Sequence, residues 1–195
     1  MNEVSEQKVM LRRELRARLR TIDAAELLRA GEGLRERLVQ QSEWLAARTV
    51  MLFASMPEEP DLWPLAERAL AEGRRLVLPR YDRDAGVYGV AEVRDLTRDV
   101  QVGSFGIREP VSTCAVWSLN QLDLVLVPGL GFDREGHRLG RGKGFYDRML
   151  SSRRGTACGV AMDWQILPAI PVEPHDQHVD CIVTPSRWLA VTRRS

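Results

Sequence analysis

Short apolar runs alternate with helical patterns along most of this chain, and this alternation limits its fold more than any other feature. Residues 122–128 (LDLVLVP) form a dense run of Leu and Val, which is typical of a strand buried on both faces of a parallel sheet. Helical patterns at residues 61–72 and 144–152 separate such runs, whereas residues 94–121 have the composition of a loop. The remaining strands are predicted at residues 49–54, 75–79, 87–93, 156–162 and 181–184. This order predicts an α/β fold with a single doubly wound, mostly parallel sheet flanked by helices.

Two helices are predicted before the first strand. Residues 8–20 give a basic amphipathic helix, because cations recur every four positions beside an apolar stripe. Capping-box spacing at residues 23–26 opens a second helix that runs to about Trp44. We therefore predict one domain over residues 1–195, with a helical N-terminal part (1–46) and a sheet-containing core (47–195). The recurring cations are Lys8, Arg12, Arg16 and Arg20, and the stripe comprises Val9, Met10, Leu11, Leu15 and Leu19.

The composition limits the partners and the compartment. The net charge is +1 over 195 residues, so the molecule has no overall field that attracts nucleic acid or anionic lipid. The cysteines, Cys114, Cys158 and Cys181, are widely spaced without a metal-binding pattern, which favours a reducing compartment. No run approaches the roughly 18 apolar residues of a membrane helix, and the N-terminal residues lack the apolar segment of a signal peptide. We expect a cytoplasmic, monomeric protein without nucleic-acid or membrane partners.

Residues 138–147 (RLGRGKGFYD) form the most informative motif for function. The three glycines allow positive φ and close approach to a ligand, while the backbone N–H groups, Arg141 and Lys143 face an anion. Asp147 adds an oxygen ligand of the kind that Mg²⁺ prefers. The motif follows the strand predicted at 122–128, so it should lie beyond the carboxyl end of that strand, where open α/β sheets bind ligands. It predicts a phosphate-binding loop that is neither a P-loop nor a G-x-G-x-x-G motif, with a solvated turn as the alternative.

Two further segments carry candidate binding residues. Lys8 and Arg12 lie one helical turn apart, a spacing that suits a polyphosphate and also occurs on solvated helix faces. Glu58, Glu59 and Asp61 follow the first predicted strand and can accept hydrogen bonds from the N–H groups of a ligand. Alternatively, they cap the next helix or interact with its dipole.

Carboxylate and aromatic residues complete the candidate site. Asp176 can join Asp147 on a magnesium ion, whereas His175 and His178 suggest a transition metal as the weaker alternative. Apolar side chains around the motif suit a flat heterocycle, and a core position for several of them is the alternative. They are Leu130, Phe132, Phe145, Tyr146 and Trp164.

Seven ordered segments between residues 8 and 176 resemble the 5-formyltetrahydrofolate cyclo-ligase family. The segments are K-x-x-L-R (8–12), F-x-S-M-x-x-E (53–59), P-R-Y (79–81), F-G-I-x-E-P (105–110), P-G-L-G-F-D (128–133), R-L-G-R-G-K-G-[FY]-Y-D (138–147) and H-D (175–176). The resemblance implies conversion of 5-formyltetrahydrofolate into 5,10-methenyltetrahydrofolate, which consumes ATP, requires Mg²⁺ and releases ADP and phosphate. It also implies an intermediate phosphorylated on the formyl oxygen, and such chemistry depends mainly on positioning and charge neutralisation.

The same resemblance assigns roles by motif. Arg141 and Lys143 are implied as the catalytic cations, and Asp147 and Asp176 as the Mg²⁺ ligands. The implied ATP-binding residues are Lys8, Arg12, Arg138, Leu139, Gly140, Arg141, Gly142, Lys143, Gly144, Phe145 and Tyr146. The implied folate-binding residues are Ala54, Met56, Glu59, Tyr81, Arg141 and Tyr146, with Glu59 reading the N–H groups of the pterin.

Two other functions stay open from the sequence. One is a sugar-phosphate or CoA-handling α/β enzyme that uses the same loop, although a carboxylate pair has no evident use there. The other is a non-catalytic folate- or RNA-binding relative, suggested by the basic first helix, and phosphate-driven RNA binding would weaken steeply with salt.

Overall fold

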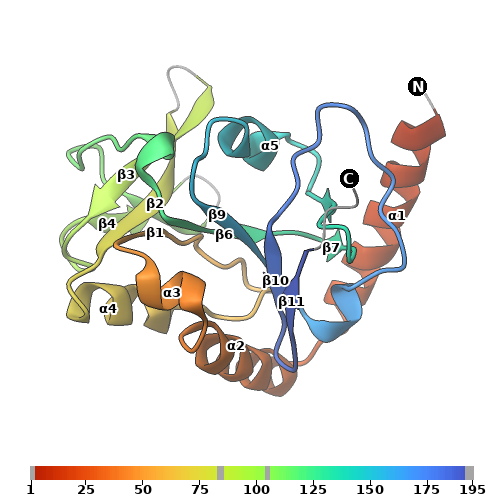
Figure 1. Cartoon of the computed structure of the whole chain (residues 1–195), viewed down its shortest axis with the longest axis horizontal. Helices are drawn as coiled ribbons and strands as arrows, with labels where there is room; N and C mark the ends of the chain where they lie inside the picture. The colour runs from red at the N-terminus through yellow and green to blue at the C-terminus, as the bar shows by residue number, and fades with distance from the viewer. Residues whose placement is uncertain (1–2, 83–85, 104–105, 192–195) are drawn as a thin grey trace.

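The computed structural model describes residues 3–82, 86–103 and 106–191 (Figure 1). The helices are α1 (Glu3–Leu19), α2 (Ala24–Leu38), α3 (Ser42–Ala46), α4 (Trp63–Ala71) and α5 (Phe145–Leu150), with 3₁₀ turns at Leu119–Gln121 and Asp163–Gln165. The strands are β1 (Thr49–Met51), β2 (Arg75–Asp82), β3 (Val87–Val93), β4 (Val100–Val102), β5 (Arg108–Pro110), β6 (Leu124–Pro128), β7 (Gly131–Phe132), β8 (Arg138–Leu139), β9 (Thr156–Val160), β10 (Cys181–Val183) and β11 (Trp188–Ala190). None of the helices in these ranges is long and apolar enough to cross a membrane. Phe105, which begins the F-G-I-x-E-P segment, lies outside the described residues.

A seven-stranded sheet in the order β11-β10-β9-β6-β1-β2-β3 forms the centre of the molecule. Neighbouring strands from β10 to β2 are parallel, and only the edge strands β3 and β11 pair antiparallel. Helix α5 covers one face, whereas α2, α3 and α4 cover the other (Figure 1). The predicted doubly wound, mostly parallel sheet is therefore confirmed.

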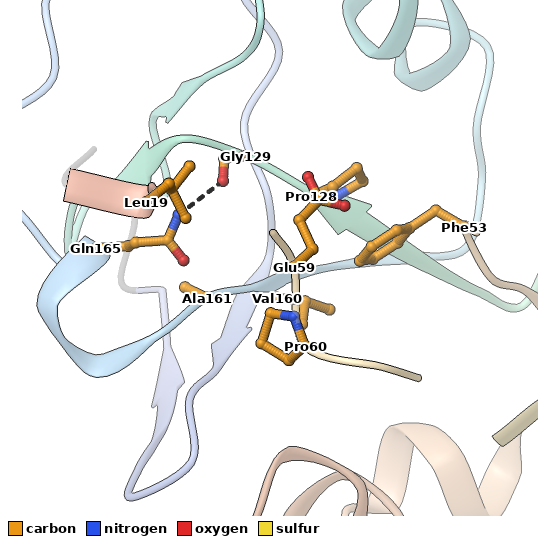
Figure 2. Close-up of a pocket in the computed structure, with 9 residues that line it drawn as sticks. All are labelled: Leu19, Phe53, Glu59, Pro60, Pro128, Gly129, Val160, Ala161 and Gln165. Atoms are coloured by element: carbon orange, nitrogen blue, oxygen red, sulfur yellow. Dashed lines mark hydrogen bonds between the residues drawn. The ribbon is translucent and has the colours of Figure 1, made fainter. Parts of the chain in front are cut away.

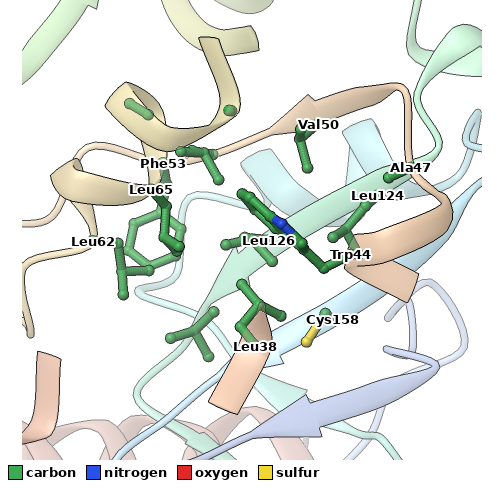
Figure 3. Close-up of a cluster of buried hydrophobic side chains, with 14 of the residues drawn as sticks. Leu38, Trp44, Ala47, Val50, Phe53, Leu62, Leu65, Leu124, Leu126 and Cys158 are labelled. Atoms are coloured by element: carbon green, nitrogen blue, oxygen red, sulfur yellow. The ribbon is translucent and has the colours of Figure 1, made fainter. Parts of the chain in front are cut away.

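Strand β6 shows why an uninterrupted apolar run forms a central strand. Leu124 and Leu126 point into the core beneath α2 to α4, whereas Val125 and Val127 point into the core beneath α5. Side chains alternate across a strand, so both faces are buried only where every residue is apolar. Figure 3 shows the first of these cores, where the indole of Trp44 is fully buried against the leucines of β6.

The N-terminal helices differ from the prediction in two ways. Asp23 caps α2 as predicted, since its Oδ1 accepts a hydrogen bond from the N–H of Glu26 at 2.7 Å. However, the chain leaves the helix after Leu38 and starts the short α3 at Ser42, so three helices precede β1 instead of two. The break lets Trp44 turn into the core, a tertiary demand that local helical periodicity does not reveal.

The apolar stripe predicted on the first helix is only partly correct. Leu15 and Leu19 are buried, but Val9 is 52% and Met10 is 74% exposed. Lys8 takes the inward position instead, with 4% of its surface exposed. The helix therefore turns its N-terminal half toward a polar neighbour rather than toward apolar core.

Several short strands were missed. The stretch 94–121, predicted as loop, contains the antiparallel pair β4 and β5, and the sheet gains an edge strand, β11. The small hairpin β7–β8 directly follows β6 and leads into the glycine-rich motif. Strands of two or three residues carry too little alternation to be recognised from sequence.

Candidate functional site

The winding of the sheet reverses between β1 and β6. Strand β2 follows β1 on one side, while β9 and β10 follow β6 on the other side. Because parallel crossovers are right-handed, α4 and α5 fall on opposite faces and the carboxyl ends of β1 and β6 border an open crevice. This is the edge of the sheet at which the sequence predicted a ligand site.

A pocket, here called the rim pocket, opens at this crevice (Figure 2). Phe53 follows β1, Pro128 ends β6 and Val160 ends β9, so the three strand ends form its apolar wall. Glu59 brings a carboxylate to the same pocket, and Leu19 at the end of α1 closes one side. The lining suits a ligand with a flat apolar part and a few hydrogen-bond donors.

Gln165, which the sequence analysis did not single out, fixes the floor of the rim pocket. Its amide Nε2 donates hydrogen bonds to the carbonyl oxygens of Gly129 and Leu130, both at 3.0 Å. Its Oε1 accepts from the N–H of Met162 at 2.7 Å. One buried amide side chain thus joins the end of β6 to the segment after β9, and no motif signals that role.

Residues 140–144, called the Gly-rich loop, connect β8 to α5. Gly142 and Gly144 have φ values of 97° and 61°, so the predicted need for positive φ is confirmed at these two positions. Gly140 is needed for another reason, because a Cβ there would lie 2.5 Å from Nη1 of Arg138. A side chain at Gly142 or Gly144 would therefore strain the loop backbone, whereas one at Gly140 would displace the guanidinium of Arg138.

Helix α1 binds the backbone of the Gly-rich loop. Nε of Arg12 donates to the carbonyl oxygen of Gly140 at 3.0 Å, and Nη2 of Arg16 donates to that of Arg141 at 2.8 Å. Burial together with the nearby Arg16 lowers the pKa of Arg12. A guanidinium has five N–H groups, so each arginine keeps donors for a ligand while it holds the loop. Arg12 and the motif, both implied as ATP-binding by the resemblance, are thus in direct contact through the loop backbone.

Arg141 joins the Gly-rich loop to the segment after β1. Its Nη2 lies 2.8 Å from Oε1 of Glu59 and 3.0 Å from Oε1 of Glu58. Burial opposes the charge of Arg141, but the two glutamates outweigh it and raise the pKa. The remaining oxygen of Glu59 accepts from the N–H of Met56 at 3.0 Å. The predicted phosphate-side and folate-side residues are thus in direct contact.

Lys8 is buried between two carboxylates of the segment before β10. Its Nζ lies 2.8 Å from Oε2 of Glu173 and 2.5 Å from Oδ2 of Asp176. Burial opposes ionisation of Asp176, but the hydrogen bonds from Lys8 and from the N–H of Glu173, together with the charge of Lys8, outweigh it and lower the pKa of this carboxyl. Glu173 was not predicted; its only signal was a carboxylate three positions before Asp176.

The carboxylate of Asp147 contacts the same segment before β10, at the residue after Asp176. Oδ1 of Asp147 accepts from Nη2 of Arg138 at 2.9 Å and from the N–H of Gln177 at 3.4 Å. Arg138 stands over the ring of Tyr146 at 5.6 Å, and burial raises the pKa of this tyrosine. The Nε of Arg138 is buried without a hydrogen-bond partner within the described part of the chain. A buried donor without a partner, a glycine-rich loop and the carboxylate of Asp147 directly after it fit a site for a phosphate and a divalent cation.

Lys143 is exposed at the tip of the Gly-rich loop. It forms no hydrogen bond or ion pair with any residue that the structure describes. Its ammonium group is therefore the cation of the loop that is still available to a ligand.

Aromatic rings continue from the Gly-rich loop to the end of β2. Phe145 lies 4.9 Å from Tyr146 and 4.1 Å from Tyr88, and Tyr88 lies 4.8 Å from Tyr81, all between ring centroids. Tyr88 was not predicted as a site residue. Ala54 and Met56 are half-buried in the segment after β1 that also carries Glu59.

Other sequence candidates lie elsewhere. Leu130 and Phe132 are fully buried in the core, and Trp164 packs under Arg18 at 4.4 Å, so the aromatic wall around the loop is smaller than predicted. Asp61 accepts from the N–H of Trp63, the first residue of α4, at 2.8 Å, although the N-cap position of this helix is taken by Leu62. His178 stacks on His137 with their centroids 4.9 Å apart. His175 instead joins Glu173 and Asp176, with ligand atoms within 4.8 Å of one another.

Comparison with known proteins gives a consistent result. Residues 4–185 match the model of the 5-formyltetrahydrofolate cyclo-ligase family. The 5-formyltetrahydrofolate cyclo-ligase of Mus musculus is 32% identical over 192 residues, which cover 91% of this chain and 93% of the mouse protein. The enzyme of the same name from Mycolicibacterium smegmatis is 35% identical over 156 residues, which cover 76% of this chain and 79% of that protein.

A solved structure agrees with these sequence relatives. The NMR structure of the 5,10-methenyltetrahydrofolate synthetase of Aquifex aeolicus superimposes with a TM-score of 0.85 at 31% identity. The superposition covers 96% of this chain and 95% of the Aquifex protein. A synthetase structure from Mycoplasma pneumoniae, at 21% identity and a TM-score of 0.73, shares the fold.

Proposed function

This chain belongs to the 5-formyltetrahydrofolate cyclo-ligase family and is a ligase, and from that premise we propose that it converts 5-formyltetrahydrofolate into 5,10-methenyltetrahydrofolate at the expense of ATP. The observation that carries the proposal is the contact between Arg141 of the Gly-rich loop and Glu59 of the rim pocket. It brings a phosphate-binding loop within hydrogen-bonding distance of a pocket suited to a pterin. Transfer of a phosphoryl group from ATP to a folate requires that the two binding regions lie next to each other.

The proposed chemistry begins at the formyl oxygen of the folate. This amide oxygen attacks the γ-phosphorus of ATP, and the bond between that phosphorus and ADP breaks. The phosphorylation prepares the next step, because a phosphorylated oxygen leaves carbon far more readily than an unmodified amide oxygen. Nitrogen-10 then attacks the formyl carbon and loses its proton, and the carbon–oxygen bond breaks to release phosphate. Each step gathers charge on phosphoryl oxygens, so cations held in place should supply most of the rate enhancement.

The residues of this chain divide that work between them. Glu59 accepts hydrogen bonds from the pterin N–H groups, and Met56, Ala54, Tyr81 and Tyr146 surround the rings. Arg141 and Lys143 stabilise the transferring phosphoryl group as the catalytic cations. The remaining ATP contacts come from Lys8, Arg12 and the run 138–146, with Arg138, Leu139, Gly140, Gly142, Gly144 and Phe145 among them.

Asp147 and Asp176 are proposed to hold Mg²⁺, which neutralises phosphate charge when it is bound with ATP. Each carboxylate is already paired with a cation, Asp147 with Arg138 and Asp176 with Lys8. Bound Mg²⁺ would take the place of Arg138 or Lys8 as the partner of these half-buried carboxylates and would keep them ionised. Lys8 then turns from Asp176 to a phosphate while Glu173 still holds it.

The same proposal includes the domain organisation, the oligomeric state, the compartment and the partners of the protein. The chain acts as one domain over residues 1–195, with 1–46 as its helical part and 47–195 as its core. It works as a monomer in the cytoplasm and binds no nucleic acid or membrane. Support for the last point comes from α1, whose Lys8, Arg12 and Arg16 bind the protein's own loops instead of facing solvent.

The test is a product assay with omissions. Purified protein is mixed with 5-formyltetrahydrofolate, ATP and Mg²⁺, and the near-ultraviolet absorbance of the methenyl product is followed together with release of phosphate. We expect one phosphate per product and no product without ATP or without Mg²⁺. Bound ATP without product would reject the folate reaction, and RNA binding that weakens with salt would favour the non-catalytic relative.

Isotopic labelling tests the phosphorylated intermediate separately. The formyl oxygen is labelled with ¹⁸O, and the inorganic phosphate is collected after turnover. The proposed route transfers one labelled oxygen to each phosphate, because the carbon–oxygen bond breaks last. Label that appears in water instead would contradict phosphorylation of the formyl oxygen while leaving the overall reaction intact.

A further inference from the structure

A second hollow, here called the arginine crevice, lies beside the rim pocket. It is lined by Arg16, Leu19, Arg20, Glu58 and Arg141. Leu19 lines both hollows, and the neighbours Glu58 and Glu59 line one hollow each. The two hollows are therefore adjacent, and a ligand longer than the rim pocket can reach the arginine crevice past Leu19.

The arginine crevice carries more positive than negative charge. Three of its five lining residues are arginines and one is a glutamate. Arg141 is paired with Glu58 at 3.0 Å, and Arg16 donates to the carbonyl oxygen of Arg141 at 2.8 Å. Arg20 is exposed, and its side chain forms no hydrogen bond or ion pair with any residue in the described ranges. The guanidinium of Arg20 is thus available to bind an anion in the crevice.

Arg20 continues a row of cations along one face of α1. Lys8 binds the segment before β10, and Arg12 and Arg16 bind successive residues of the Gly-rich loop. Each step of four residues advances about 6 Å along a helix. The row therefore runs from the proposed phosphate side toward the rim pocket, and Arg20 stands about 18 Å from Lys8, well away from the phosphates.

We propose that the arginine crevice binds the carboxylates of the substrate's glutamate tail, with Arg20 as the main contact. This inference rests on the proposed function. 5-Formyltetrahydrofolate has flat rings at one end and a glutamate at the other, and the apolar rim pocket followed by a cationic crevice matches this order. A guanidinium pairs with a carboxylate through two parallel hydrogen bonds, which makes arginine well suited to the task. Each further γ-linked glutamate adds one carboxylate to the tail.

The test compares substrates that differ only in tail length. The KM for monoglutamyl and triglutamyl 5-formyltetrahydrofolate is measured in the wild type and in Arg20→Ala. We expect Arg20→Ala to raise the KM of the triglutamyl substrate about fivefold, as for a partly exposed ion pair, and to leave kcat within about twofold. The KM of the monoglutamyl substrate rises less, and added salt reduces the difference between the two substrates.

Arg13→Ala is the matched control. Arg13 is an exposed arginine of the same helix and does not line the arginine crevice. Its removal changes the net charge equally, so it reveals any general effect of charge on a polyanionic substrate. Equal effects of Arg13→Ala and Arg20→Ala on both substrates would overturn the proposal.

A binding measurement separates this proposal from the cyclo-ligase assignment. γ-Linked triglutamate without a pterin is titrated into the protein, and the side-chain Nε–H resonances of the arginines are followed by NMR. We expect the Arg20 resonance to shift and the Arg13 resonance to stay, even if no methenyl product forms. No shift at Arg20 in an active enzyme, or a larger shift with inorganic triphosphate than with triglutamate, would overturn the proposal.

Discussion

Several charged residues of the candidate site are already paired with one another before any ligand binds. Arg141 is held by Glu58 and Glu59, and Lys8 by Glu173 and Asp176. Buried or half-buried charges without partners are costly, so these pairs keep the site charged and ordered. A ligand that brings phosphates and N–H groups replaces partners rather than finding bare charges, and the geometry of each side chain is largely set beforehand.

Glu59 tests this arrangement most simply. Glu59→Gln keeps the shape of the side chain but removes the charge that binds Arg141 and that is proposed to accept from the pterin. We expect the KM for 5-formyltetrahydrofolate to rise about tenfold, corresponding to one charge-assisted hydrogen bond. This KM is measured by steady-state kinetics at saturating ATP. Glu67→Gln on the exposed side of α4 is the control and should leave the KM unchanged. An unchanged KM in Glu59→Gln would remove Glu59 from the folate contacts.

Asp99 gives a prediction of pH dependence at the corner between β3 and β4. Hydrogen bonds from the side chain of Arg98 and the N–H of Arg94 lower the pKa of Asp99 to about 2 from its ordinary 3.8. A carboxyl whose pKa falls on folding stabilises the folded protein above its unfolded pKa, and this contribution is lost as the pH falls through the folded value. It is therefore complete above about pH 5 and disappears toward pH 2.

The measurement is the urea midpoint of the wild type and of Asp99→Asn at a series of pH values. We expect the variant to be less stable at neutral pH and the difference to shrink as the pH falls from about 4 toward 2. A difference that stays constant over this range would mean that the charge of Asp99 does not stabilise the fold.

Sequence patterns singled out the candidate residues of this site, but they did not reveal the partners that the structure gives these residues. Residues 138–147 predicted a binding loop because three glycines and three cations lie close together in the sequence. The partner of Lys8 is Glu173, which is 165 positions away, so no local pattern connects the two. The hydrogen bonds from Arg12 and Arg16 to the Gly-rich loop likewise depend on the position that the sheet gives this loop, which the sequence pattern does not reveal.

At the scale of elements, β9 shows how close packing fixes the wall of the site. A Cβ at Gly159 would lie 2.6 Å from the ring of Phe132, which is fully buried. We expect Gly159→Ala to reduce the free energy of unfolding by about 1–3 kcal/mol, since the ring must shift to make room. Urea denaturation measures this cost.

Gly89 in β3 is the matched control for Gly159. Nothing lies within 4 Å of a Cβ placed there, so Gly89→Ala should change the free energy of unfolding little. Equal stabilities of the two variants would show that the contact between Gly159 and Phe132 does not restrict β9.

Long, strongly patterned elements were predicted well, and short ones were not. Strand β3 has the predicted bounds, and β6 and β9 lie within the predicted ranges, because dense apolar runs leave few alternatives. The hairpin of β4 and β5 and the edge strand β11 have three residues each, and they exist because a neighbouring strand supplies hydrogen bonds. Propensity is a weak guide where pairing decides the structure.

At the scale of the whole molecule, the reversal of winding between β1 and β6 brings distant segments together. Helix α1, the segment after β1, the Gly-rich loop and the segment before β10 all meet at the carboxyl edge of the sheet. No single segment could bind a nucleotide and a folate side by side. On the proposed function, this fold would place the phosphoryl donor next to its folate acceptor, and Lys143 would supply the unpaired charge of the Gly-rich loop to the transferring group.

The kcat of Lys143→Ala, measured as formation of methenyl product at saturating substrates, tests this view most directly. We predict a loss of about 100-fold or more with little change in stability, because an exposed side chain is removed and transition-state charge is left unneutralised. Arg134→Ala, which removes an exposed cation from the turn between β7 and β8, should keep the kcat of the wild type. A kcat in Lys143→Ala within about twofold of the wild type would contradict a role for the Gly-rich loop in phosphoryl transfer.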